Sequence, residues 1–132
     1  MDGLIIKPKW GELILNGLKS WEIRGSNTSH RGRHYLIESG TNKVYGEFDL
    51  VDSQPLTERD FYDNLLKHQL PNEYLYNSDL LKRYKTPYRW AIENVEKYDE
   101  PIYYEHPQGA VIWVKDVILH EEMEDEYLRS GY

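Results

Sequence analysis

Three ionisable residues lie close together in the sequence, at a spacing that brings their side chains to one place. Lys19 follows the Gly17-Leu18 pair, and Glu22 and Arg24 come shortly after it. Polar and apolar residues alternate up to Arg24 as they do in a strand, so Glu22 and Arg24 fall on the same face. An arginine fork binds phosphate or a base edge, an ammonium is a mobile cation, and a carboxylate accepts hydrogen bonds from exocyclic amines. The spacing predicts a compact polar cluster whose groups could bind a phosphate or a base.

The same cluster has two other interpretations. If the cleft excludes water, Lys19 loses its proton readily and acts as a base, with Glu22 as its partner in proton transfer. Alternatively, Glu22 and Arg24 form a cross-strand ion pair that fixes the register of the strand. The residues alone leave recognition, catalysis and a structural role open.

A second basic group follows in the turn His30-Arg31-Gly32-Arg33. Two guanidiniums flank a glycine that exposes its backbone amide, an arrangement suited to phosphate contacts. An ordinary basic loop is the alternative.

Aromatic residues supply the remaining candidates. Tyr88 and Trp90 alternate onto one face of a late strand, where their rings could stack on a base or pack in the core. Trp10, Phe48 and Trp113 are assigned to the core.

Composition limits the chemistry and the location. The chain has no cysteine, and its five histidines show no metal-binding spacing, so no metal or other cofactor is expected. The absence of cysteine favours a reducing compartment. There is no signal-like start and no apolar run of about 20 residues, so the protein is expected to be soluble and cytoplasmic, without a membrane partner.

The charge is unevenly distributed. The net charge of -7 argues against a general binder of the phosphate backbone. However, residues 120–132 hold five acids and one base, whereas residues 1–35 hold six bases and three acids. A local cationic face is therefore compatible with the acidic total. The acidic tail, 119–132, is interpreted as solvated surface or as a docking segment for a protein partner.

The elements that must position these residues follow from periodicity. A strand at 4–6 precedes a helix over 8–16, which Pro8 begins and Gly17 caps. Thr57 is the expected N-cap of a helical insertion, in which Phe61, Leu65 and Leu66 form the buried stripe. Gly46 marks a bulge or a close approach of another backbone. Further strands are expected at 20–24, 34–37, 44–51, 88–93 and 110–117, and a second short helix near 78–84.

This order predicts an α+β domain, a partly open antiparallel β-barrel with an N-terminal helix between its first two strands and a helical insertion. At 132 residues the chain fits one such domain.

Six ordered segments resemble the ASCH domain family. The run Gly17-Leu18-Lys19-Ser20-Trp21-Glu22-Ile23-Arg24 matches its G-x-K-x-x-E-x-R signature. The other five resemble the family's opening motif, its H-R-G-R turn and three later strand motifs: Lys7-Pro8-Lys9-Trp10, 29–33, 45–47, 88–90 and 109–113. The resemblance implies a PUA-like fold over 1–118, and a cleft that holds the signature residues.

The resemblance implies several functions. Members of the family are described as RNA or DNA binders, coactivator modules, a ribonuclease and an amidohydrolase of N4-acetylcytidine. The amidohydrolases use a threonine nucleophile three residues after the lysine, where this chain has Glu22, and a carboxylate cannot replace that hydroxyl. We therefore expect an RNA or nucleotide partner, with DNA as a variant. The alternatives are an enzyme acting on RNA or a modified nucleoside, and a protein-interaction adaptor.

Overall fold

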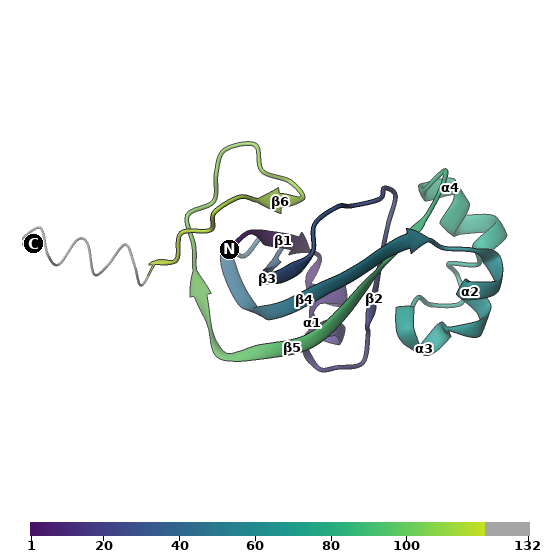
Figure 1. Ribbon diagram of the computed structural model, residues 1–132, viewed down its shortest axis with the longest axis horizontal. Helices are drawn as coiled ribbons and strands as arrows, with labels where there is room; N and C mark the ends of the chain where they lie inside the picture. Colours follow the sequence, from purple (N-terminus) through teal and green to yellow (C-terminus); the bar gives the residue numbers. More distant parts are fainter. Residues whose placement is uncertain (121–132) are drawn as a thin grey trace, which may run out of the picture.

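The computed structural model describes residues 1–120 and arranges them around one curled, six-stranded sheet (Figure 1). The strand order runs from one edge to the other as β2 (Trp21–Arg24), β5 (Tyr88–Tyr103), β4 (Lys43–Pro55), β3 (Gly32–Glu38), β1 (Gly3–Ile6) and β6 (Trp113–Val114). The predicted α+β, PUA-like, partly open barrel is confirmed. One pair, β1 with β3, is parallel, because the chain crosses through the first helix and β2 before it returns.

Helix α1 (Pro8–Leu15) lies between β1 and β2 in the sequence, as predicted. Proline stands at its start, where the missing amide costs nothing, and Gly17 follows its end with a φ of 76°. Ile14 and Leu15 pack with Leu36 and Phe48 in the main hydrophobic core. The helix therefore fills the inside of the curled sheet.

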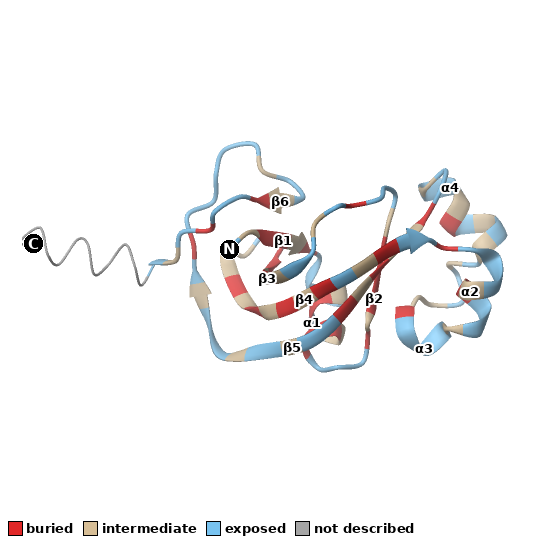
Figure 2. Cartoon of the chain, in the orientation of Figure 1, coloured by how far each residue is buried: buried red, intermediate tan, exposed pale blue. Residues whose placement is uncertain are grey.

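Strands β4 and β5 are longer than the sequence suggested. Strand β4 covers 13 residues and β5 covers 16, and three register shifts between them bend the sheet. Buried and more exposed residues alternate along much of β4 (Figure 2). The last predicted strand, 110–117, was too long, because only Trp113 and Val114 pair with β1.

The helical insertion between β4 and β5 forms one end of the molecule (Figure 1). It contains α2 (Glu58–Asp63), α3 (Leu65–His68), the π-helical turn η1 (Tyr76–Leu80) and α4 (Leu81–Arg83). The predicted N-cap is confirmed, since the Thr57 hydroxyl accepts a hydrogen bond from the Asp60 amide at 3.0 Å.

The buried side of this insertion differs from the prediction. Leu66 is 82% exposed and Leu65 is also exposed, so both assignments to the buried stripe were wrong. The break at Asn64 turns the following residues, and His68 is buried in their place. Phe61 is buried, as predicted, and packs with Trp21 and other residues of a second core cluster, so the insertion rests on β2.

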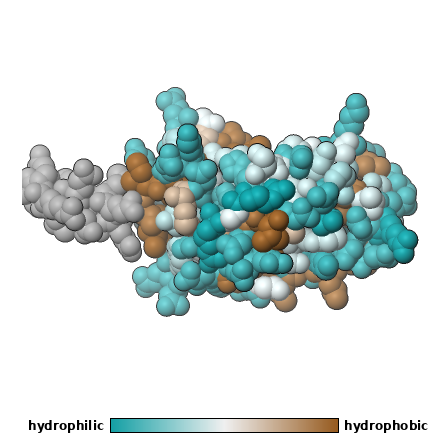
Figure 3. Space-filling view, in the orientation of Figure 1, coloured by the Kyte–Doolittle hydropathy of each residue, from teal (hydrophilic) through white to brown (hydrophobic). Residues whose placement is uncertain are grey.

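The end of the described chain returns to the sheet. Leu119, which the sequence interpretation placed in the tail, forms an isolated antiparallel bridge with Tyr104. The rest of the predicted acidic tail, 121–132, lies outside the described residues. Most of the face in Figure 3 is hydrophilic, with apolar residues in small separate groups. Within residues 1–120, no helix is long and apolar enough to span a membrane.

Gly46 supplies a test of the sheet's curvature. A Cβ atom at this position would lie 2.3 Å from the Glu96 carbonyl oxygen and 2.7 Å from a methyl of Leu15. The register shift beside Gly46 confirms the predicted bulge and close approach. We expect Gly46→Ala to lower the free energy of unfolding by about 1–3 kcal/mol, because backbone has to move.

Urea denaturation measures this effect. Gly40→Ala is the matched control, because the space around Gly40 is open and only its φ of 82° opposes a side chain, at a cost of about 1 kcal/mol. Equal stability of Gly46→Ala and the wild type would contradict the close approach.

Candidate functional site

Lys19 is aimed inward by the end of α1. The amides of Leu18 and Lys19 both donate to the Leu13 carbonyl, which closes the turn around Gly17. The Lys19 side chain is 2% exposed, and its ammonium donates to the His68 carbonyl from the insertion. Burial lowers the pKa of Lys19 to about 8, although the Glu22 carboxylate raises it.

Glu22 lies between two cations. One carboxylate oxygen accepts from Arg24 Nε at 3.1 Å and from a terminal nitrogen of the same guanidinium at 3.0 Å. Its other oxygen lies 3.9 Å from the Lys19 ammonium. Arg24 also donates to the Ile5 carbonyl at 2.9 Å, which ties β2 to β1. The predicted cluster therefore forms, with Lys19 behind Glu22 and Arg24 beside it.

The cluster opens on a cavity of about 290 Å³, which we call the site cavity. This volume is close to the lower limit for small-molecule sites. Its polar and aromatic walls come from β2, from both ends of the Lys7–Trp10 segment and from the insertion: Lys7, Trp10, Glu22, Arg24, Arg83 and Tyr84. Glu22 and Arg24 therefore remain accessible to a ligand although they pair with each other, because both line the cavity.

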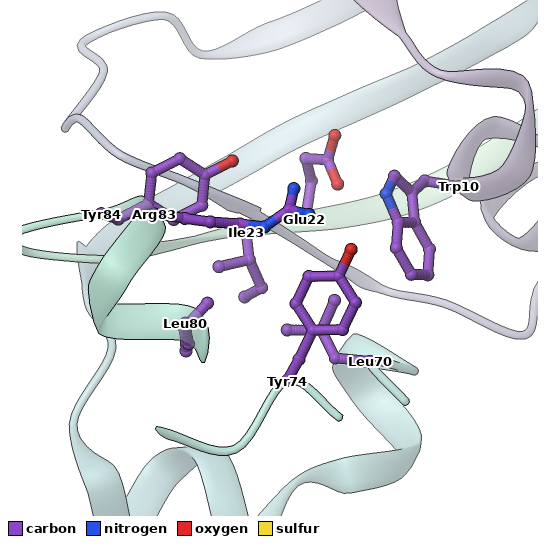
Figure 4. A pocket seen from close by; sticks show the side chains of 8 residues that line it. All are labelled: Trp10, Glu22, Ile23, Leu70, Tyr74, Leu80, Arg83 and Tyr84. Atoms are coloured by element: carbon purple, nitrogen blue, oxygen red, sulfur yellow. The ribbon is translucent and has the colours of Figure 1, made fainter. Parts of the chain in front are cut away.

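A narrow cleft of about 40 Å³ continues the site cavity toward the insertion (Figure 4). In this view the Glu22 carboxylate lies between the Trp10 indole on one side and Arg83 with Tyr84 on the other. Tyr74 stands below them, and the Arg83 guanidinium lies 4.8 Å from the centre of its ring. The cleft thus combines a carboxylate, a guanidinium and three aromatic side chains.

The walls of the site cavity are cationic although the whole chain is acidic. Lys7, Arg24 and Arg83 carry positive charges, and Glu22 carries the opposing one. The whole chain has a net charge of -7. A partly enclosed surface of one sign concentrates ligands of the other sign, so this cavity favours an anion.

His68 links the insertion to the cluster. Its Nδ1 accepts from the Leu70 amide at 3.0 Å, so Nε2 is the protonated nitrogen that donates to the Phe61 carbonyl at 2.8 Å. The ring is fully buried and stacks on Phe61. Burial lowers the pKa of His68, and the charge of Lys19 lowers it further. A neutral histidine therefore fixes the carbonyl that holds Lys19.

The basic turn is placed elsewhere. Arg33 pairs with Glu47, Asp49 and Glu96. Arg31 donates to the carbonyls of Thr28 and His30.

The His30 ring stacks on Trp113, with centroids 3.7 Å apart. Among the described residues that line the site cavity, none comes from the turn His30–Arg33. Phosphate contacts by His30, Arg31 and Arg33 stay a prediction, separate from this cavity.

The aromatic candidates all contact the main core, and Trp10 among them also lines the site cavity. Trp90 is 2% exposed, packs with Trp113 and lies under the Arg24 guanidinium, so the expected base stacking on Trp90 does not fit this geometry. Tyr88 is half-buried and packs on the main core. Trp10 and Trp113, assigned to the core, are half-buried and pack against the main core, and Trp10 also forms a wall of the site cavity. Phe48 is fully buried, as predicted.

Sequence reasoning missed four cavity residues. Lys7 and Trp10 belong to a motif that it noted, so the motif itself was the available signal. Arg83 and Tyr84 belong to the insertion and carry no local signal, because only the packing of α4 near β2 brings them to the cavity.

Comparisons with known proteins agree with this architecture. The family model of the ASCH domain matches residues 4–107. A structure described as ASCH from Zymomonas mobilis is 12% identical, with a TM-score of 0.59, covering 99% of this chain and 80% of that one. A serine-to-alanine variant from the same organism is 12% identical, with a TM-score of 0.60 and coverages of 97% and 94%. No match was found among curated proteins.

His68 predicts a pH-dependent stability. The folded state keeps it neutral, whereas the unfolded chain binds its proton near pH 6.5. The free energy of unfolding should therefore fall as the pH drops below about 6.5, by at most about 1.4 kcal/mol per pH unit from this residue. Urea unfolding at pH 7.5, 6.5 and 5.5 measures the loss.

His68→Gln is the comparison, because an amide does not titrate. We expect its stability to fall less than that of the wild type over this interval. If the free energies of unfolding of the two proteins fell equally with pH, the buried neutral histidine would not be the cause of the loss of stability.

Proposed function

Because the chain belongs to the ASCH domain family, we propose that the site cavity binds a nucleotide, either free or as part of a single-stranded RNA. The observation that carries this proposal is the cationic wall of Lys7, Arg24 and Arg83 around a buried carboxylate, in a chain whose net charge is negative. Phosphate satisfies the cations, and a base satisfies the carboxylate and the aromatic walls.

Each wall group has a matching ligand group. The guanidinium of Arg83 binds phosphate as a planar fork, and Lys7 contributes a second positive charge. Glu22 accepts hydrogen bonds from the amine or imino edge of a base, because Lys19 and Arg24 keep its carboxylate in place. Trp10 and Tyr84 offer ring faces on which a base stacks. In this account Lys19 is a positioning residue.

Hydrolysis of RNA or of a modified nucleoside is the second candidate, favoured by the lowered pKa of Lys19, about 8. Lys19 lies behind Glu22, so a proton leaving the substrate would reach Glu22 first. Incubation with RNA and with N4-acetylcytidine, read by mass spectrometry, separates the two functions. A product lost in Glu22→Gln would favour catalysis, and unchanged substrates would favour binding. An adaptor function of the acidic tail and a cytoplasmic location stay predictions.

Arg83 gives the most direct test of the binding proposal. Its side chain is exposed and its substitution should leave the fold intact. We expect Arg83→Ala to weaken binding of nucleoside 5′-monophosphates by about tenfold, the loss of one hydrogen bond to a charged group. Isothermal titration calorimetry at low salt measures it.

Arg59→Ala is the matched control, because Arg59 is an exposed arginine of the same insertion that pairs with Asp63. It should bind as the wild type does. Equal affinity of Arg83→Ala and Arg59→Ala would contradict the assignment.

Lys19 predicts how binding depends on pH. Its ammonium loses a proton near pH 8, which removes a positive charge 3.9 Å from Glu22. The cluster then becomes less attractive to phosphate, whose second ionisation is complete well below this pH. Affinity for a nucleoside 5′-monophosphate should fall severalfold between pH 7 and 9.

The measurement is calorimetry across this range on the wild type and on Lys19→Met, with circular dichroism to establish that the variant folds. Lys19→Met should bind the nucleoside 5′-monophosphate more weakly than the wild type, and its affinity should not fall between pH 7 and 9. An equal fall in affinity between pH 7 and 9 in both proteins would assign this pH dependence to a group other than Lys19.

A further inference from the structure

A second cavity, of about 250 Å³, adjoins the site cavity. The two share three wall residues: Ile5, Ser39 and Val111. Val111 is 75% exposed, so an apolar side chain stands uncovered at the boundary between them. The site cavity has a similar volume, about 290 Å³. Because the two cavities share part of their walls, one ligand can extend from one into the other.

The second cavity has its own polar wall. The Tyr104 hydroxyl and His106 Nδ1 form a hydrogen bond at 2.6 Å, which orients the imidazole and leaves Nε2 as the ring nitrogen that can meet a ligand. Burial raises the pKa of Tyr104, so its phenol stays neutral. Ile37 and Ala110 contribute apolar wall. The wall also carries Glu38, Ser39 and Asn42, and among the described residues no lysine or arginine lines it. Hydrogen-bonding groups on a partly apolar wall, with a carboxylate and without a cation, suit a base or ribose better than a phosphate.

The boundary between the cavities suits a phosphate. Lys7 lines the site cavity and directly follows Ile6, whose carbonyl accepts from the Ser39 amide at 2.8 Å. The Lys7 and Ser39 positions are therefore close together beside the shared wall. A cation and a hydroxyl at the junction of two cavities match the charge pattern of two nucleosides joined by one phosphate.

We propose that the second cavity holds the neighbouring nucleotide of a single-stranded RNA, with its linking phosphate near Lys7 and Ser39 and its nucleoside against His106 and Val111. This inference rests on the proposed function of the site cavity and extends it, because it makes the preferred ligand an oligonucleotide.

Calorimetry with matched probes tests the second cavity. The probes are adenosine and uridine 5′-monophosphates and the corresponding 5′-phosphorylated dinucleotides, added to the full chain. Tethering the second nucleotide makes its binding intramolecular, so the dinucleotides should bind the wild type about tenfold more tightly. In His106→Ala this advantage should fall below about threefold, while mononucleotide affinity stays unchanged.

Two further variants make the result specific. Ala110→Phe fills the second cavity from its apolar wall and should also remove the dinucleotide advantage. His120→Ala is the control, because His120 is an exposed histidine that packs on Tyr103 and lines neither cavity.

The outcomes separate the two proposals. Mononucleotide binding without any dinucleotide advantage would overturn the second site and leave the proposed function standing. An advantage that survives both His106→Ala and Ala110→Phe would place the second nucleotide elsewhere and overturn the inference as well. Failure of every probe to bind the wild type would reject the proposed function, and this inference with it.

Discussion

The site depends on one buried carboxylate held between two cations. Glu22 is 4% exposed, and a carboxylate at that depth persists only when charged partners compensate for its lost hydration. Arg24 supplies a forked contact on one side and Lys19 a more distant charge on the other. Together the three leave a positive excess at the base of the site cavity. Lys7 and Arg83 add two further cations to its wall, so the cationic character of the site cavity rests on the wall as well as on the partners of Glu22.

The compensating cations are themselves held by different parts of the chain. Arg24 reaches the Ile5 carbonyl across the sheet, and Lys19 reaches the His68 carbonyl in the insertion. Phe61 of the same insertion packs on the side of β2 that carries Trp21. The insertion is therefore a structural part of the site, because it fixes Lys19 and adds Arg83 to the wall. The sheet alone would present Glu22 and Arg24 without a closed cavity.

Local rules predicted the features that depend on neighbours in sequence. The glycine cap of α1, the alternation of β2 and the bulge at Gly46 all follow from backbone geometry and periodicity. These were enough to bring Glu22 and Arg24 together.

Features that depend on distant packing were not predictable in the same way. An aromatic residue has the same local signal whether its ring packs in the core or lines a cavity, so the sequence assigned Trp10 of α1 to the core alone and left Trp90 open between the core and base stacking. Arg83 became a wall residue through the fold of an insertion whose helices are short. Arg33 forms ion pairs with three carboxylates of β4 and β5, which lie far from it in sequence.

A nuclear magnetic resonance titration of the indole N–H groups tests the central claim most directly. The chain has four tryptophans, all of them within the described residues 1–120, and of these Trp10 alone lines the site cavity. Addition of a nucleoside 5′-monophosphate should shift the Trp10 resonance in a saturable manner, and should affect Trp21 and Trp113 much less. A titration that leaves Trp10 unmoved, or that instead moves Trp113, which stacks on His30, would contradict the assignment of the cavity as the nucleotide site.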